Sequence, residues 1–129
     1  MTRLNIYMQR IINYYKENKQ QFDNVGVKLI LLDGSTIQLK NVNDNGLYNA
    51  IYQNVDGVII LRDNIVRDSD QNKGYGTRYL TFMVDVFNRC RCKGIVGKMG
   101  DSDNVIKLTT FYEKCGFEVY GDVHIRLMY

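Results

Sequence analysis

The sequence predicts one domain of the α/β (α+β) class, a mixed β-sheet flanked by helices, and three observations carry this prediction. The chain has 129 residues, of which 45% are apolar, and this suits one domain with one hydrophobic core. An amphipathic pattern over residues 2–21 predicts a helix, and Asp33-Gly34 between two apolar runs predicts a β-hairpin. A strand-like run over residues 57–66 then leads through a turn with two glycines into a helical run over residues 74–91.

The first half of the chain supplies a helix and the hairpin. Two strands are predicted, over residues 25–32 and 36–42, because apolar and β-branched residues dominate both runs. The helix over residues 2–21 presents one apolar stripe, which we expect to pack on the sheet. That stripe is formed by Leu4, Met8, Ile11, Ile12 and Tyr15.

Residues 43–54 fit two structures. Asn43 or Asp44 could cap a short helix with apolar residues turned inward, whereas residues 47–53 could equally form a strand. We favour the helix, which makes this segment an insertion before the next strand.

The second half alternates helices with strands. A strand over residues 94–99 is expected to run parallel to the strand over residues 57–66, because the helix between them makes a right-handed crossover. A helix over residues 105–115 ends at Gly116, and the last strand covers residues 122–129. The buried positions predicted for the central helix are Leu80, Met83, Val84 and Phe87.

The turn before the central helix is the most informative stretch. A helix start offers unpaired N–H groups and the positive end of the helix dipole, and glycine lets that backbone approach an anion. The run lacks the Gly-Lys-Ser/Thr of a nucleotide-triphosphate loop, and Tyr79 replaces the third glycine of a dinucleotide fingerprint. The residues of this turn are Gln71, Asn72, Lys73, Gly74, Tyr75, Gly76 and Thr77.

The pattern Gln-x-x-Gly-x-Gly of this turn resembles motif A of the GNAT (Gcn-related N-acetyltransferase) superfamily, whose turn amides hold the diphosphate of acetyl-CoA. A second stretch, Phe111-Tyr112 followed by Gly116-Phe117, resembles motif B of the same superfamily. The resemblance implies a largely antiparallel sheet with splayed central strands, acetyl-CoA as co-substrate and no metal. The residues that it implies for acetyl-CoA binding are Ile65, Val66, Gln71, Asn72, Lys73, Gly74, Tyr75, Gly76, Thr77 and Asn104.

The resemblance also implies an enzyme that moves an acetyl group to a primary amine of a small molecule, a peptide or a protein lysine. Tyr112 matches the tyrosine that donates a proton to the departing thiolate. A phenol with a pKa of about 10 is protonated at neutral pH and can therefore act as an acid. Asp56, Asp63 and Asp68 flank the preceding strand and are candidate general bases only by proximity, so we favour reading them as solvated carboxylates.

Two alternatives compete with the enzyme. The chain could be a catalytically inactive CoA-binding or protein-interaction module of the same fold. It could also be a nucleic-acid binder, but a net charge of +3 is too low to favour this reading. The basic residues such a binder would use are Arg78, Arg89, Arg91 and Lys93.

Composition suggests where the protein works. The three cysteines, Cys90, Cys92 and Cys115, are an odd number without zinc-type spacing, so we expect reduced and partly buried thiols. The sequence contains no run that could span a membrane and starts without a signal-peptide pattern, so a cytoplasmic protein is expected. His124 is expected to be structural, and a homodimer is possible.

Overall fold

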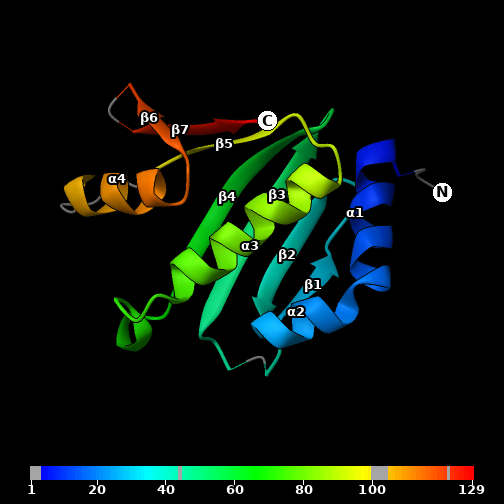
Figure 1. Ribbon diagram of the computed structural model, residues 1–129, viewed down its shortest axis with the longest axis horizontal. Coiled ribbons are helices and arrows are strands. Elements are labelled where there is room, and N and C mark those ends of the chain that lie inside the picture. The colour runs from blue at the N-terminus through cyan, green and yellow to red at the C-terminus, as the bar shows by residue number, and fades with distance from the viewer. Residues whose placement is uncertain (1–3, 44, 100–104, 122) are drawn as a thin grey trace.

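The computed structural model describes residues 4–43, 45–99, 105–121 and 123–129, and these residues form one seven-stranded sheet with helices packed against it (Figure 1). The strand order is β1-β2-β3-β4-β5-β7-β6. The helices are α1 (Ile6–Glu17), α2 (Lys19–Val25), α3 (Tyr75–Arg89), α4 (Val105–Lys114) and a short 3₁₀ turn, η1 (Asp68–Asp70). The strands are β1 (Val27–Leu31), β2 (Thr36–Asn41), β3 (Tyr48–Val55), β4 (Val58–Val66), β5 (Gly94–Lys98), β6 (Glu118–Tyr120) and β7 (His124–Met128).

The sheet is antiparallel except at its centre. Strands β1 to β4 form a meander, β4 and β5 are parallel across the α3 crossover, and β7 pairs antiparallel with both β5 and β6. The parallel contact is short, because only Val58–Leu61 of β4 pair with β5. The remainder of β4, up to Val66, leaves its neighbour, so the two central strands splay apart. The mixed, largely antiparallel sheet with splayed central strands is therefore confirmed.

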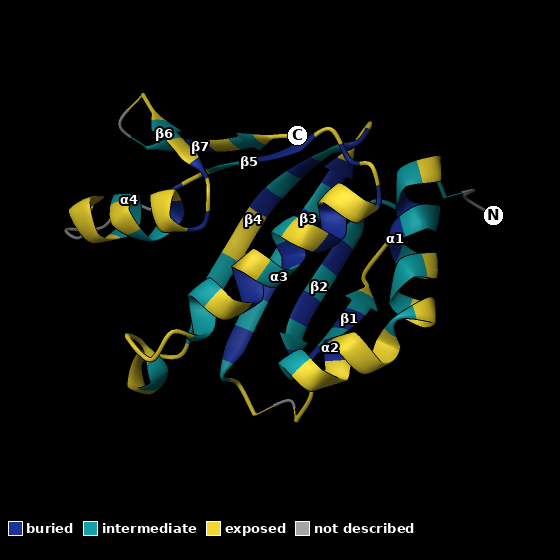
Figure 2. Ribbon diagram, in the orientation of Figure 1, coloured by how far each residue is buried: buried dark blue, intermediate teal, exposed yellow. Residues whose placement is uncertain are grey.

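One face of the meander carries the core. Helices α1, α2 and α3 contact one another and lie across β1 to β4, with their buried sides toward the strands (Figure 2). The Phe22 ring of α2 lies edge-on to Phe82 of α3 at 4.8 Å between centroids, and Phe87 meets Tyr52 of β3 at 5.0 Å. The buried residues of α3 are Tyr79, Leu80, Met83, Val86 and Phe87, so the predicted stripe is right except that Val84 is only half-buried.

The predicted helix over residues 2–21 is two helices in the described part of the chain. The strand that follows them also starts later than predicted. Asn18 ends α1, because both its backbone N–H and its side-chain amide donate to the Tyr14 carbonyl at 2.9 Å. Helix α2 then continues to Val25 and stops at Gly26, whose φ of 96° is left-handed. The first strand therefore starts two residues later than expected, at Val27.

The helix favoured for residues 43–54 is wrong, because this segment is the strand β3. Tyr48, Ala50, Tyr52 and Asn54 are buried and alternate with half-buried residues, which is the two-residue period of a strand. Since β3 lies between β2 and β4 in the sheet, it is a regular strand of the meander and not an insertion. Asp44 lies outside the described residues.

The predicted hairpin at Asp33-Gly34 is confirmed with a longer loop than two residues. Leu32 N–H donates to the Thr36 carbonyl at 2.9 Å, so three residues lie between the last bonded pair. Asp33 Oδ1 accepts from the Ser35 N–H at 2.9 Å, which turns the chain through an aspartate side chain.

Phe87 offers a direct test of this core. It is 0% exposed, and replacing it by alanine is expected to lower the free energy of unfolding by about 3–5 kcal/mol because a cavity replaces the ring. Denaturant titration followed by circular dichroism measures the change. The neighbouring exposed Asn88 is the control, since Asn88→Ala should change stability by about 0.5 kcal/mol at most. A loss below about 1 kcal/mol for Phe87→Ala would contradict this packing.

Candidate functional site

The start of α3 leaves a row of backbone N–H groups without protein acceptors. The first bond of the helix runs from the Arg78 N–H to the Gly74 carbonyl at 3.0 Å. Within the described residues, the amides of residues 72–77 donate to no protein atom, and Gly74 has no side-chain cap. Asn72 and Gly74 are left-handed, with φ of 67° and 87°, a backbone shape that turns successive N–H groups to one side. The turn is therefore suited to an anion, as predicted.

These amides border a cavity of about 500 Å³. The cavity lies between the turn with the start of α3 on one side and α4 on the other, with the end of β4 at its back. It is lined by Asn64, Val66, Asp70, Gln71, Asn72, Gly74, Tyr75, Gly76, Thr77, Lys107, Leu108, Thr110, Phe111, Tyr112 and Lys114. Residues that the sequence placed in two separate motifs thus border one space.

The side chains of the turn make contacts that the sequence did not reveal. Gln71 folds back, and its Nε2 donates to the Val66 carbonyl and to Asp68 Oδ1, both at 3.1 Å. Lys73 Nζ lies 3.4 Å from the Asp70 carboxylate, which also pairs with Arg67 at 2.6 Å. The hydrogen bond from Arg67 lowers the pKa of Asp70. Gln71 and Lys73 thus direct their side-chain donors to protein acceptors, whereas the main-chain N–H groups of the turn border the cavity.

The backbone of β4 opens toward the same cavity. The Arg67 N–H donates to the Leu47 carbonyl at 2.9 Å, so these two residues form a hydrogen-bonded pair of the ladder with β3. Bonded and non-bonded pairs alternate in an antiparallel ladder, which makes Ile65 the next bonded residue. Asn64 and Val66 therefore point their N–H and C=O groups away from β3, into the gap left by the splay. Of the two predicted residues, Val66 faces the gap with its backbone and Ile65 faces β3.

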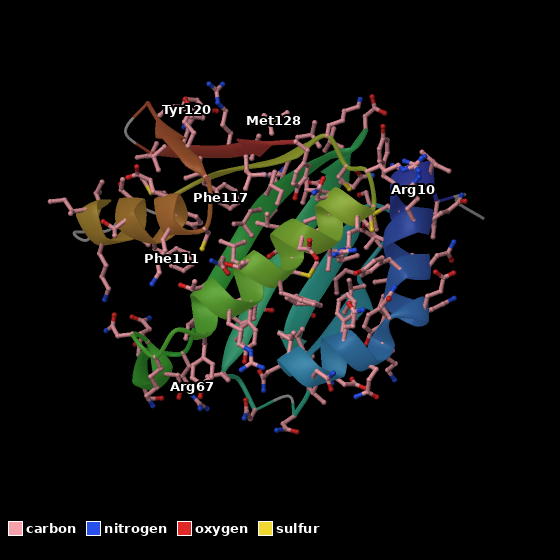
Figure 3. All side chains as sticks on the ribbon, viewed as in Figure 1. Arg10, Arg67, Phe111, Phe117, Tyr120 and Met128 are labelled. Atoms are coloured by element: carbon pink, nitrogen blue, oxygen red, sulfur yellow. The ribbon has the colours of Figure 1, made fainter. Side chains whose placement is uncertain are left out.

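Gly76 lies where the start of α3 comes close to α4. A Cβ atom on Gly76 would lie 3.3 Å from the Phe111 ring and 3.4 Å from the Val66 side chain. Figure 3 shows Phe111 reaching from α4 toward the start of α3. Glycine at this position leaves room for the Phe111 ring, which forms part of the cavity wall. From the sequence, Phe111 was known only as a motif residue.

Tyr112 lies in the cavity wall and is only 7% exposed. Its ring packs edge-on against Phe111 at 5.0 Å and Phe117 at 5.8 Å. Burial raises the pKa of Tyr112, and the neighbouring Asn64 side chain opposes that rise. Asn64 also accepts a hydrogen bond from the Tyr48 hydroxyl. Asn64 is not among the predicted site residues, because it stands in a polar break of the strand where the sequence does not show which face each side chain takes.

The candidate bases do not meet Tyr112. Asp56 lies in the β3–β4 turn, where its carboxylate is 3.4 Å from Lys93, and Asp63 and Asp68 are exposed. None of the three lines the cavity as the described residues define it. Asn104, the remaining predicted binding residue, lies outside the described residues.

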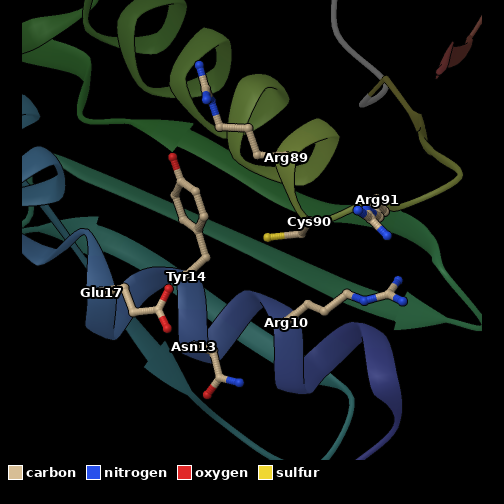
Figure 4. A pocket seen from close by; sticks show the side chains of 7 residues that line it. All are labelled: Arg10, Asn13, Tyr14, Glu17, Arg89, Cys90 and Arg91. Atoms are coloured by element: carbon tan, nitrogen blue, oxygen red, sulfur yellow. The ribbon is translucent and has the colours of Figure 1, made fainter.

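The basic residues weighed for nucleic acid do not form one face. Arg78 lies in the first turn of α3 and donates to the Asn24 carbonyl at 3.1 Å, whereas Arg89 ends α3 and pairs with Asp85 at 2.8 Å. Eleven residues of helix place these two arginines about 16 Å apart. A second hollow of about 300 Å³ lies beyond that end of α3, against α1 (Figure 4). It is lined by Arg10, Asn13, Tyr14, Glu17, Arg89, Cys90 and Arg91.

The cysteines and the histidine lie outside the cavity. Cys90, Cys92 and Cys115 are free and buried, and burial raises the pKa of Cys90 to about 12 and that of Cys92 to about 11. His124 packs edge-on against Tyr120 at 5.4 Å. In the part of the chain that the structure describes, no group of three or more His, Cys, Asp or Glu side chains could hold a metal ion. The helices described there are also too short or too polar to cross a membrane.

Comparisons with known proteins agree with this geometry. No protein-family model matches the sequence, and no curated protein matches it at a significant level. Among solved structures, the chain is similar to the ribosomal-protein-S18-alanine N-acetyltransferase of Escherichia coli, with 18% identity, 86% of this chain and 76% of that chain covered, and a TM-score of 0.59. It is also similar to an acetyltransferase of Bacillus subtilis in complex with CoA, with 14% identity, 88% and 85% coverage and a TM-score of 0.57.

A third structure, an acetyltransferase of the GNAT family from Staphylococcus aureus, is 16% identical, covers 95% of this chain and 90% of its own, and has a TM-score of 0.56. Identities this low establish a common fold and nothing finer. The chain therefore shares the fold of these acetyltransferases.

Proposed function

We propose that residues 1–129 form a single acetyltransferase domain that uses acetyl-CoA to acetylate a primary amine. The observation that carries this proposal is the row of unpaired main-chain N–H groups at residues 72–77, which borders the same cavity as Tyr112. A diphosphate accepts hydrogen bonds from such donors and is attracted by the positive end of α3. The cavity extends from these donors to a buried phenol, as a phosphate-bearing thioester requires.

In this proposal the diphosphate of acetyl-CoA binds the amides of Asn72 to Thr77, with Gln71 and Lys73 at its edge. The pantetheine arm then extends along the open edge of β4. There the backbone of Val66 offers the pairing groups, and Ile65 contributes as its neighbour. Asn104, which precedes α4, is proposed to complete the binding site. Gln71 has to release the Val66 carbonyl when the arm binds, since its amide now occupies that oxygen at 3.1 Å.

The reaction follows from this placement. The lone pair of a neutral amine attacks the thioester carbonyl carbon, and the C=O electrons move onto oxygen, where hydrogen bonds stabilise the oxyanion. The oxyanion re-forms the carbonyl as the C–S bond breaks, and the departing thiolate takes the phenolic proton of Tyr112. The new amide loses its extra proton to water, and water returns a proton to the phenolate. The products are an N-acetylated amine and free CoA.

A catalytically inactive CoA-binding module is the second candidate. The observation in its favour is that Asp56, Asp63 and Asp68 lie away from the cavity, so none of them can take the proton of an ammonium group there. An amine that arrives neutral needs no such base, and this is the form of substrate we propose.

The free, buried thiols suit a reducing compartment, which supports a proposed cytoplasmic location. A primary amine as acceptor and a homodimer in solution are further parts of the proposal, and the purified protein can be tested for both.

Two measurements separate the candidates. Calorimetry with acetyl-CoA is expected to give micromolar binding with one site, whereas a DNA duplex should give none at physiological salt. Thiol release, followed over a panel of small amines, polyamines and lysine peptides, is expected to exceed the rate without amine for at least one acceptor. Binding without thiol release on the whole panel would favour the inactive module. Absence of acetyl-CoA binding would reject both candidates.

A further inference from the structure

The cavity wall contains a buried polar arrangement behind Tyr112. The Tyr48 hydroxyl on β3 donates to the Asn64 side-chain oxygen on β4, and Asn64 in turn borders the cavity together with Tyr112. Tyr48 is only 2% exposed. Asn64 Oδ1 thus serves as an acceptor for that hydroxyl, and a buried hydroxyl without an acceptor is costly.

This contact decides which way the Asn64 amide points. An asparagine amide can be turned over, and its neighbours decide which atom faces each side. Because the Tyr48 hydroxyl takes the oxygen, the NH₂ group is left for the cavity side, where Tyr112 lies. The Tyr48 ring is itself held against Tyr79 of α3 at 4.6 Å between centroids, so the donor cannot move away freely.

We infer that Asn64, held by Tyr48, is a positioning residue that donates an N–H to the Tyr112 oxygen and thereby directs the Tyr112 O–H into the cavity. This inference rests on the proposed function for its catalytic meaning. A phenol oxygen that accepts from an amide keeps its own hydrogen for another acceptor, here the thiolate of CoA. The same N–H stabilises the phenolate that remains after the proton has left, which makes Tyr112 a better acid despite its burial.

The first test needs no turnover. Tyrosine labelled with ¹³C at the ring carbon that bears the hydroxyl reports each phenol pKa by NMR, and Tyr112→Phe identifies the signal of Tyr112. The other titratable groups near it are Tyr48 and Tyr52 on β3 and Cys115, which directly follows α4. We expect Asn64→Leu and Tyr48→Phe to raise the Tyr112 pKa, whereas Asn88→Leu, an exposed control on α3, leaves it unchanged. An unchanged Tyr112 pKa in Asn64→Leu would overturn the inference.

The second test is a double-mutant cycle on turnover. Asn64→Leu should lower kcat by about tenfold or more, with the Kd for acetyl-CoA within about twofold of wild type. If Asn64 acts through Tyr112, Asn64→Leu in the Tyr112→Phe background lowers kcat no further. A merely structural effect would multiply with the loss from Tyr112→Phe, and that result contradicts the inference. Circular dichroism checks that each variant is folded.

The two proposals fail in different ways. If the wild type releases no thiol with any amine, the proposed function is rejected, while a raised Tyr112 pKa in Asn64→Leu still supports the contact. If the wild type turns over and Asn64→Leu matches it in kcat, the function stands and the role of Asn64 is rejected.

Discussion

Gly76→Glu is expected to weaken acetyl-CoA binding at least about 100-fold while leaving the secondary structure intact. The new side chain would start 3.3 Å from Phe111 and take up space in the cavity that Gly76 lines. Its carboxylate would also face the proposed diphosphate, and two like charges about 4 Å apart repel by about 4 kcal/mol at a protein surface, ample for that loss. Gly76 has no left-handed φ, so the backbone itself tolerates a side chain.

Calorimetry with acetyl-CoA measures this loss. Asn88→Glu makes the same charge change at an exposed position near the other end of α3, and it should bind acetyl-CoA as the wild type does. Circular dichroism separates lost binding from lost folding. Affinity retained by a folded Gly76→Glu protein would remove the basis for placing the diphosphate at residues 72–77.

Tyr112→Phe is expected to reduce kcat by about 10²–10⁴-fold, the range that one general acid supplies, with little change in the Kd for acetyl-CoA. The ring and its contacts with Phe111 and Phe117 remain, so only the proton donor is lost. Thiol release under saturating acetyl-CoA and amine gives kcat. Equal rates for both proteins would show that another group protonates the thiolate.

The pH profile adds a second readout for Tyr112. Burial raises its pKa, and an acid with a raised pKa stays protonated to higher pH. Activity that depends on the protonated phenol should therefore persist above the ordinary tyrosine value of about 10, as far as the protein stays folded. Cys115, which directly follows α4, is the nearby thiol, and Cys115→Ser controls for its titration. An alkaline decline that is the same in Tyr112→Phe would belong to some other group.

Much of the fold follows from local patterns in the sequence. The turn 71–77, the central helix and the glycine stop at Gly116 each depend on a few neighbouring residues, and each was predicted at its place. Gly116 has a φ of 94°, as its role at the end of α4 requires. The confirmed parallel pairing of β4 with β5 followed from the handedness of the crossover between them.

The wrong or missing predictions concern residues whose structure depends on contacts with parts of the chain that are distant in the sequence. The apolar residues of segment 43–54 fit both the helical and the strand period, and only pairing with β2 and β4 on either side makes the segment a strand. The pairing of Lys73 with Asp70 depends on the chain reversing through η1, which the sequence does not show. Asn64 was missed for the same reason, because its neighbours Tyr48 and Tyr112 are 16 and 48 positions away along the chain.

Strand β4 contains one residue more than its partner β3. That extra residue determines which side chains of β4 face the cavity. Tyr52 faces Leu61 and Ile51 faces Asp63, so Arg62 has no counterpart and forms a β-bulge. Leu61 and Asn64 both point to the side of α3, although three positions separate them, which strict alternation forbids. Deleting Arg62 would thus remove the bulge and restore strict alternation, with Asn64 and Val66 still on the side of α3, opposite Ala50 and Tyr48. An alignment with a strand that lacks the bulge therefore needs a gap at Arg62, because without it the residues on one side of the bulge are matched one position off.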